Sequence, residues 1–147
     1  MTKTIAILGA GNTAGAAIAH ELAGAGYILL LMDKQSERCA SLRLSLLNDN
    51  PLSMIEVATC ARESAWEADI VVLALSEQEQ AESAQAICEV VTGKRVIWIR
   101  DCPDEAPGEQ LIAVHHQIEL LETMLPHTRI INASLADFRY HAATLLA

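Results

Sequence analysis

Residues 4–33, TIAILGAGNTAGAAIAHELAGAGYILLLMD, are the stretch that decides the fold. An uncharged apolar run at residues 4–8 predicts a buried strand, and a glycine-rich turn then leads into an alanine-rich segment whose apolar side chains recur with helical spacing. A second apolar run, residues 27–32, ends at Asp33. The stretch therefore predicts a strand, a tight turn, a helix and a second strand in succession.

The turn carries small residues at three fixed positions. Gly9, Gly11 and Ala14 fit the pattern G-x-G-x-x-G/A, which is typical of dinucleotide-binding turns. The first glycine allows a sharp reversal, the second allows the main chain to approach a pyrophosphate, and a small third residue allows the helix to lie close to the strand. Asn12 and Thr13 fall at the helix start, where unpaired main-chain N–H groups attract anions. A tight turn without a ligand would carry the same glycines.

Asp33 stands nineteen residues after Ala14, where the pattern places a carboxylate for the adenosine ribose. A 2′-phosphate would meet this carboxylate, and two like unit charges about 4 Å apart cost about 4 kcal/mol near a protein surface before salt screening. NAD is therefore favoured over NADP unless the neighbouring Lys34 turns inward. Asp33 could instead be only the cap of the following helix, a role for which Ser36 competes.

The whole chain, residues 1–147, predicts one α/β domain. With 52% hydrophobic but only 3% aromatic residues, the core must consist of aliphatic side chains, as in a parallel sheet covered by helices on both faces. Strand-like runs alternate with helical patterns, which predicts a doubly wound parallel sheet, the Rossmann fold, with about six strands in the order 3-2-1-4-5-6. Further strands are expected around residues 54–59, 68–76, 95–100 and 129–133. Helices are expected around 36–47, 62–67, 77–92, 111–125 and 135–145, with Trp66 against the sheet edge.

Several classes of function are disfavoured by the composition. A net charge of −9 and ten scattered basic residues argue against nucleic acid or an anionic membrane as a partner. No apolar run approaches the ~20 residues that cross a bilayer, and the first strand follows Met1 without a signal peptide, so we expect a cytoplasmic protein. Four cysteines without zinc-like spacing are expected to be buried thiols: Cys39, Cys60, Cys88 and Cys102. No metal site is predicted, because His115 and His116 are adjacent and point in different directions on a helix.

The predicted topology also places the binding crevice. In an open parallel sheet, ligands bind outside the carboxyl ends of the strands where the strand order reverses, here between the strands that end at Leu8 and Leu75. We therefore expect Ala74, Leu75 and Ser76 beside the middle of a bound cofactor. The loop of residues 101–103 is expected nearer its reactive ring.

Four segments, IAILGAGNTAGAAIAHELAGAGY, ADIVVLALS, GKRVIWIRDCPDE and MLPHTRIINAS, resemble the nucleotide domain of the deazaflavin-dependent NADP reductases and their 6-phosphogluconate-dehydrogenase-like relatives. The resemblance implies an oxidoreductase that binds NAD(P). It places the following residues at the pyrophosphate: Gly9, Gly11, Asn12, Thr13 and Ala14. Where that family has a Ser/Thr-Arg pair for a 2′-phosphate, this chain has Asp33 and Lys34, and Cys102-Pro103 replaces its Asn-Pro.

Three readings of function follow. The first is an oxidoreductase that transfers hydride between a nicotinamide cofactor and an unidentified small acceptor, in a pocket completed by a partner chain. The second is a non-catalytic dinucleotide-binding or redox-sensing module, because the candidate proton donors, Asp101, Cys102, His115 and His116, have no visible partner in the sequence. The third is a degenerate short-chain dehydrogenase, although Tyr140 is followed four residues later by Thr144 instead of the lysine which those enzymes need.

An association of two chains is suggested only by apolar segments near the C-terminus. The ladder Leu111, Val114, Ile118, Leu121 and Leu125, and residues 138–140, are the candidate homodimer surfaces. Either could equally be ordinary core.

Overall fold

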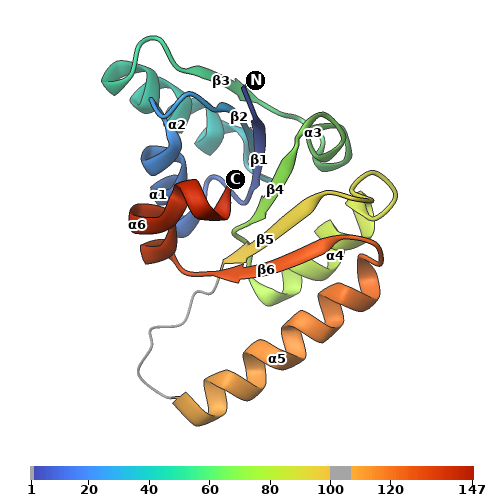
Figure 1. The fold of residues 1–147 in the computed structure, drawn as a ribbon. Helices are drawn as coiled ribbons and strands as arrows, with labels where there is room; N and C mark the ends of the chain where they lie inside the picture. The colour runs from blue at the N-terminus through green and yellow to red at the C-terminus, as the bar shows by residue number, and fades with distance from the viewer. Residues whose placement is uncertain (1, 100–106) are drawn as a thin grey trace.

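The structure is a computed structural model that describes residues 2–99 and 107–147, and it contains a six-stranded sheet in which all neighbouring strands run parallel. The order across the sheet is β3-β2-β1-β4-β5-β6 (Figure 1). The predicted Rossmann topology is therefore confirmed. The strands are β1 Thr4–Leu8, β2 Ile28–Met32, β3 Met54–Val57, β4 Ile70–Leu73, β5 Arg95–Ile99 and β6 Arg129–Ala133.

Six helices join and cover these strands. They are α1 Thr13–Leu22, α2 Ser36–Asp49, α3 Ala61–Glu67, α4 Glu77–Ile87, α5 Pro107–Met124 and α6 Leu135–Leu145. One buried cluster joins α1, α2 and α6 to one face of the sheet, and a second joins α3, α4 and α5 to the other. Figure 1 shows the two groups on opposite sides of the strands.

The alternation of side chains along the central strand explains why both faces are apolar. Ile5 and Ile7 of β1 belong to one cluster, while Ala6 and Leu8 belong to the other, and all four are 0–1% exposed. Because successive strand residues point to opposite faces, a strand buried on both sides must be a continuous apolar run. Burial on both faces therefore explains why residues 4–8 carry no charge.

Two expectations about α3 and β4 are corrected. The fourth strand is limited to Ile70–Leu73, so Ala74 and the residues after it form the turn into α4. Trp66 does not pack against the sheet edge, because its side chain is 68% exposed while the preceding Ala65 takes the buried position of α3.

The expectation of buried thiols holds for Cys39 alone among the described cysteines. Cys39 is buried in α2, and burial, with a further contribution from the charge of Asp33, raises the pKa of its thiol to about 11. Cys60 and Cys88 are partly exposed. Both lie at a helix boundary, Cys60 as the N-cap residue of α3 and Cys88 as the C-cap residue of α4, and Cys102 lies outside the described residues.

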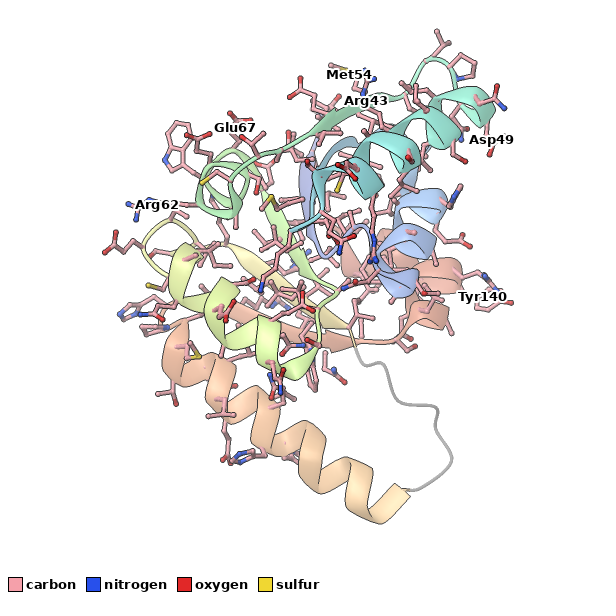
Figure 2. The ribbon with its side chains drawn as sticks, turned by 180° about the vertical axis from the view of Figure 1, so that it is seen from behind. Arg43, Asp49, Met54, Arg62, Glu67 and Tyr140 are labelled. Atoms are coloured by element: carbon pink, nitrogen blue, oxygen red, sulfur yellow. The ribbon has the colours of Figure 1, made fainter. Side chains whose placement is uncertain are left out.

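At the edge strand β3, an arginine side chain binds a main-chain carbonyl that faces away from the sheet. Ala58 N donates to Leu31 O at 2.8 Å, so by the alternation of a parallel ladder the carbonyl of Ile55 in β3 points away from β2. Arg43 of α2 donates its Nε to that carbonyl at 2.7 Å. Figure 2 shows Arg43 beside Met54 at the start of this strand.

Neither a membrane-spanning helix nor a metal centre is found among the described residues. No helix in residues 2–99 and 107–147 is long and apolar enough to cross a membrane. Within the same ranges, His, Cys, Asp and Glu side chains form no group of three or more that could hold a metal ion.

Replacement of Phe138 by alanine tests the packing of α6. Phe138 is 1% exposed and belongs to the cluster that includes α1 and β5. We expect Phe138→Ala to lower the free energy of unfolding by about 3–5 kcal/mol in urea denaturation, because it leaves a cavity in an aliphatic core.

Tyr140→Ala is the matched control, since Tyr140 lies on the same helix, is 73% exposed and points away from the body in Figure 2. It should change the free energy of unfolding by no more than about 0.5 kcal/mol. Equal losses in the two variants would contradict the described orientation of α6.

Candidate functional site

The turn between β1 and α1 is tied to the carboxyl end of β2. Met32 O accepts hydrogen bonds from Gly9 N at 2.8 Å and Ala10 N at 3.1 Å, and Asp33 Oδ2 accepts one from Gly11 N at 3.0 Å. Three consecutive main-chain amides of the turn thus have partners on the neighbouring strand end. The turn is therefore held against the end of β2 by Met32 and Asp33.

The glycines of the turn are required by close main-chain contacts. Gly9 has φ +88°, and a Cβ there would lie 2.3 Å from Ala74 O. A Cβ on Gly15 would lie 2.1 Å from Gly9 O, which shows that the closest approach of α1 to the turn occurs at Gly15. The sequence pattern places the close approach at Ala14, which is only half-buried. The missed signal was a glycine inside a helix, where glycine is unfavourable unless packing requires it.

Gly11 has a different reason to lack a side chain. A Cβ there would lie 2.6 Å from Asp33 Oδ2. Only glycine therefore lets the carboxylate reach the main-chain amide of the same residue.

The first turn of α1 has no side-chain cap. Asn12 is the N-cap residue, but its side chain makes no capping hydrogen bond and instead donates Nδ2 to Ala74 O at 3.0 Å. By contrast, Ser76 accepts from Glu79 N at the start of α4, and Ser134 and Asp137 form a capping box at the start of α6. The first N–H groups of α1, with the positive end of its dipole, are therefore available to an anion.

A cleft of about 370 Å³ opens in front of this helix start. Its size falls in the range of small-molecule sites, roughly 300–1,000 Å³. One wall is the start of α1 and the other is the turn from β4 into α4. The lining residues are Gly11, Asn12, Thr13, Ala14, Arg38, Ala74, Leu75, Ser76, Glu79 and Ile99.

Seven of the ten predicted cofactor-binding residues lie in this lining, and the other three lie elsewhere. Gly9 is a buried residue of the turn itself. Asp33 touches Gly11 from the end of β2. Lys34 does not turn inward: its Nζ lies 3.1 Å from Glu82 Oε2 of α4, and that hydrogen bond and the negative charge of Glu82 raise the pKa of Lys34.

The carboxylate of Asp33 is fixed by main-chain donors on both oxygens. In addition to Gly11 N, Gln35 N donates to Oδ1 at 2.9 Å. Ser36, the competing candidate for the cap of α2, does not cap it, since the N-cap residue is Gln35, whose side chain makes no capping hydrogen bond. Asp33 therefore both organises the start of α2 and reaches the glycine turn.

Three lining residues were not anticipated: Arg38, Glu79 and Ile99. Arg38 lies in the first turn of α2, with its Cβ 2.9 Å from where a Gly11 Cβ would be. Glu79 accepts from Ser76 Oγ at 3.1 Å, and the sequence Ser76-x-x-Glu79 is a capping pattern that could have revealed it. Ile99 ends β5 and follows directly from the topology.

The candidate proton donors do not meet in this cleft within the described residues. Asp101, Cys102 and the rest of the loop 101–103 lie outside the described residues, and His115 and His116 are exposed on α5. The Tyr140 side chain lies on the outer side of α6 (Figure 2).

The parallel order of the sheet, the glycine turn and the carboxylate at the end of β2 define the class of the protein: it has the fold of the NAD(P)-binding oxidoreductases. The family model "NADP oxidoreductase coenzyme F420-dependent" matches residues 4–99, more than half of the chain. The chain belongs to this family, and the resemblance seen in the sequence is confirmed.

Solved structures show the same fold at low sequence identity. A pyrroline-5-carboxylate reductase from Coxiella burnetii aligns with TM-score 0.66 and 17% identity over 90% of this chain and 43% of its own. An imine reductase variant from Myxococcus stipitatus in complex with NAD+ aligns with TM-score 0.61 and 14% identity over 91% and 41%. A protein described as an F420-dependent NADP reductase from an Arthrobacter species aligns with TM-score 0.54 and 18% identity over 98% and 90%.

The chain thus spans about two fifths of the length of the first two of these structures. A search of curated proteins finds no match.

Replacement of Gly15 tests the contact between α1 and the turn. Gly15→Ala should lower the free energy of unfolding by about 1–3 kcal/mol, because its Cβ meets the rigid main-chain oxygen of Gly9. Urea denaturation measures this. His20→Ala, at an exposed position of the same helix, is the control and should stay within about 0.5 kcal/mol. An unchanged stability of the Gly15 variant would show that α1 does not approach the turn this closely.

Proposed function

We propose that this chain binds a nicotinamide dinucleotide in the cleft at the start of α1, and that it supports hydride transfer between that cofactor and a small acceptor. The observation that carries the proposal is the uncapped N-terminus of α1 beside a carboxylate fixed at the end of β2. The residues present fit such a cofactor, because donors for a diphosphate and an acceptor for ribose hydroxyls lie on adjacent strand ends.

The diphosphate would be held mainly by main-chain groups. Thr13 and Ala14 line the cleft and are the first residues of α1, so their N–H groups and the helix dipole favour two phosphates there. Arg38 adds a positive charge to the same lining. Glu79 adds a negative one and lies on the α4 wall, so it disfavours a diphosphate placed toward α4 and favours one placed against α1.

Asp33 would hold the adenosine ribose. A carboxylate has about four acceptor positions, and the main chain uses one on each oxygen, which leaves one on each for a hydroxyl. Those main-chain bonds also prevent the carboxylate from turning away from a 2′-phosphate. Since Lys34 is already paired with Glu82, it does not neutralise Asp33. We therefore propose NAD over NADP, with exposed Arg38 as the one cation of the described lining that acts in the opposite direction.

The chemistry of the site divides between cofactor and chain. A bound nicotinamide supplies the hydride transfer, while the chain positions the ring and excludes water. Leu75 and Ile99 are the apolar lining residues suited to that role, at the ends of β4 and β5. The role of Asp101 or Cys102 as a proton donor stays a prediction.

The cofactor preference can be measured by titrating the chain with NADH and NADPH and following nicotinamide fluorescence. We expect NADH to bind about tenfold or more tightly, because salt screening leaves part of the repulsion between Asp33 and a 2′-phosphate. Asp33→Asn should narrow this ratio, since it removes the charge but keeps an acceptor for Gly11 N.

Glu37→Gln is the matched control, because Glu37 is an exposed acid of the same helix start that does not line the cleft. It should leave the ratio unchanged. A wild-type preference for NADPH, or an equal effect of both variants, would reject Asp33 as the discriminating group.

A second candidate function is a dinucleotide-binding module without turnover. The observation in its favour is that Arg38 and Glu79 are the only titratable side chains among the described residues of the lining. Steady-state oxidation of NADH or NADPH with flavin, deazaflavin, imine and small carbonyl acceptors separates the two candidates. Turnover of any acceptor supports the oxidoreductase, and tight cofactor binding without turnover supports the module.

A further inference from the structure

A second charged cavity lies at the amino ends of the strands, whereas the cleft lies at their carboxyl ends. It has a volume of about 400 Å³ and is lined by residues at the amino ends of the strands. Its charged side chains are Lys3, Asp69, Lys94, Arg95 and Arg129. Four of the ten basic residues of a chain with net charge −9 are thus gathered at one place.

Part of this gathering has a structural explanation. Lys94 Nζ donates to Ala65 O at 2.8 Å and Trp66 O at 2.6 Å, at the end of α3. At the end of α6, Lys3 Nζ donates to Leu146 O, and Arg95 Nη1 donates to Leu145 O at 2.8 Å and Ala147 O at 3.3 Å. Cations at helix C-termini satisfy free carbonyls and oppose the dipole. Three of the four cations therefore support helix ends.

Two observations are left over. Within the described residues, Arg95 Nε is the one buried side-chain nitrogen or oxygen without a hydrogen-bond partner. Arg129 is exposed and makes no hydrogen bond or ion pair to the described part of the chain. Because Arg95 Nε is shielded from solvent, an ion in the cavity does not reach it, and Arg129 is the cation of this cavity whose donors are open to a ligand.

Several cations outside the cavity are paired with acidic side chains, whereas those of the cavity are not. Lys34, Arg62 and Arg139 each form an ion pair with a glutamate, at 3.1, 2.9 and 3.1 Å. The four cations of the cavity form no such pair with an acidic side chain of the described residues. Burial lowers the pKa of Lys94, and the charge of Asp69 offsets this only in part. Four cations against the single acidic side chain of Asp69 leave the side chains of this lining with an excess of positive charge.

We propose that this cavity binds a small phosphate-bearing anion, with Arg129 as its principal ligand and the charges of Lys3, Lys94 and Arg95 in support. A phosphate brings more than one negative charge and several acceptor oxygens, which suits a site with several cations and one carboxylate. Arginine presents a planar fork of donors that matches phosphate oxygens, and the guanidinium of Arg129 is exposed at the cavity. The proposal does not depend on the nucleotide cleft.

Inorganic pyrophosphate is a suitable probe, because residue-resolved NMR of the full chain distinguishes the two possible sites. We expect saturable shifts of the Ile70 and Gly93 amide signals, which line the cavity, and no such shifts with chloride at equal ionic strength. Shifts confined to Thr13 and Ala14 would place the probe at the start of α1 and overturn the proposal. So would shifts that rise without saturation, which indicate an adventitious ion only.

Variants test the assigned ligands. Arg129→Gln should weaken pyrophosphate binding at this cavity about tenfold, the usual loss for a charge-assisted hydrogen bond. Arg62→Gln removes an equal charge from exposed α3 and should leave the affinity unchanged. Asp69→Asn should tighten binding, roughly threefold, because it removes the opposing charge and keeps an acceptor for Thr4 N. An unchanged affinity in the Arg129 variant, or weaker binding in the Asp69 variant, would contradict the assignment.

Discussion

The site depends on the bonds that join the glycine turn to the end of β2. Met32 O takes the amides of Gly9 and Ala10, and Asp33 takes that of Gly11. These bonds fix the direction in which α1 leaves the sheet, and they fix the carboxylate beside it. Each glycine then has a stated cause: contact with Ala74 at Gly9, with Asp33 at Gly11 and with Gly9 itself at Gly15. A turn so constrained can present the start of a helix to a ligand without further ordering.

The parallel fold also gives different charges to the two ends of its strands, which we call the carboxyl edge and the amino edge. Because every strand runs in the same direction, helices begin at the carboxyl edge and end at the amino edge. The carboxyl edge therefore collects positive dipole ends, and the amino edge collects free carbonyls, which attract Lys3, Lys94 and Arg95. The anions proposed for the two cavities would thus meet main-chain N–H groups at one of these edges and side-chain cations at the other.

The fold and much of the site could be predicted from the sequence because they follow from periodicity and glycine positions. The alternation of strand-like and helical segments was sufficient for the strand order, and the glycine turn and the end of the fourth strand indicated seven lining residues. What failed depends on side-chain direction, which no sequence pattern fixes. Lys34 could have faced the ribose, but Glu82 lies within its reach on α4. Arg38 and the exposure of Trp66 likewise depend on how a helix is rotated against the sheet.

The hydrogen bond from Arg43 to Ile55 has a consequence for self-association. An open edge strand can recruit a strand from another molecule, which leads to continuous sheets and aggregates. Here the guanidinium occupies an outward carbonyl of β3, and a bulky charged group stands where an incoming backbone would have to lie. A second molecule that extends the sheet on this side would first have to displace that group and bury its charge. Arg43 thus disfavours extension of the sheet at β3.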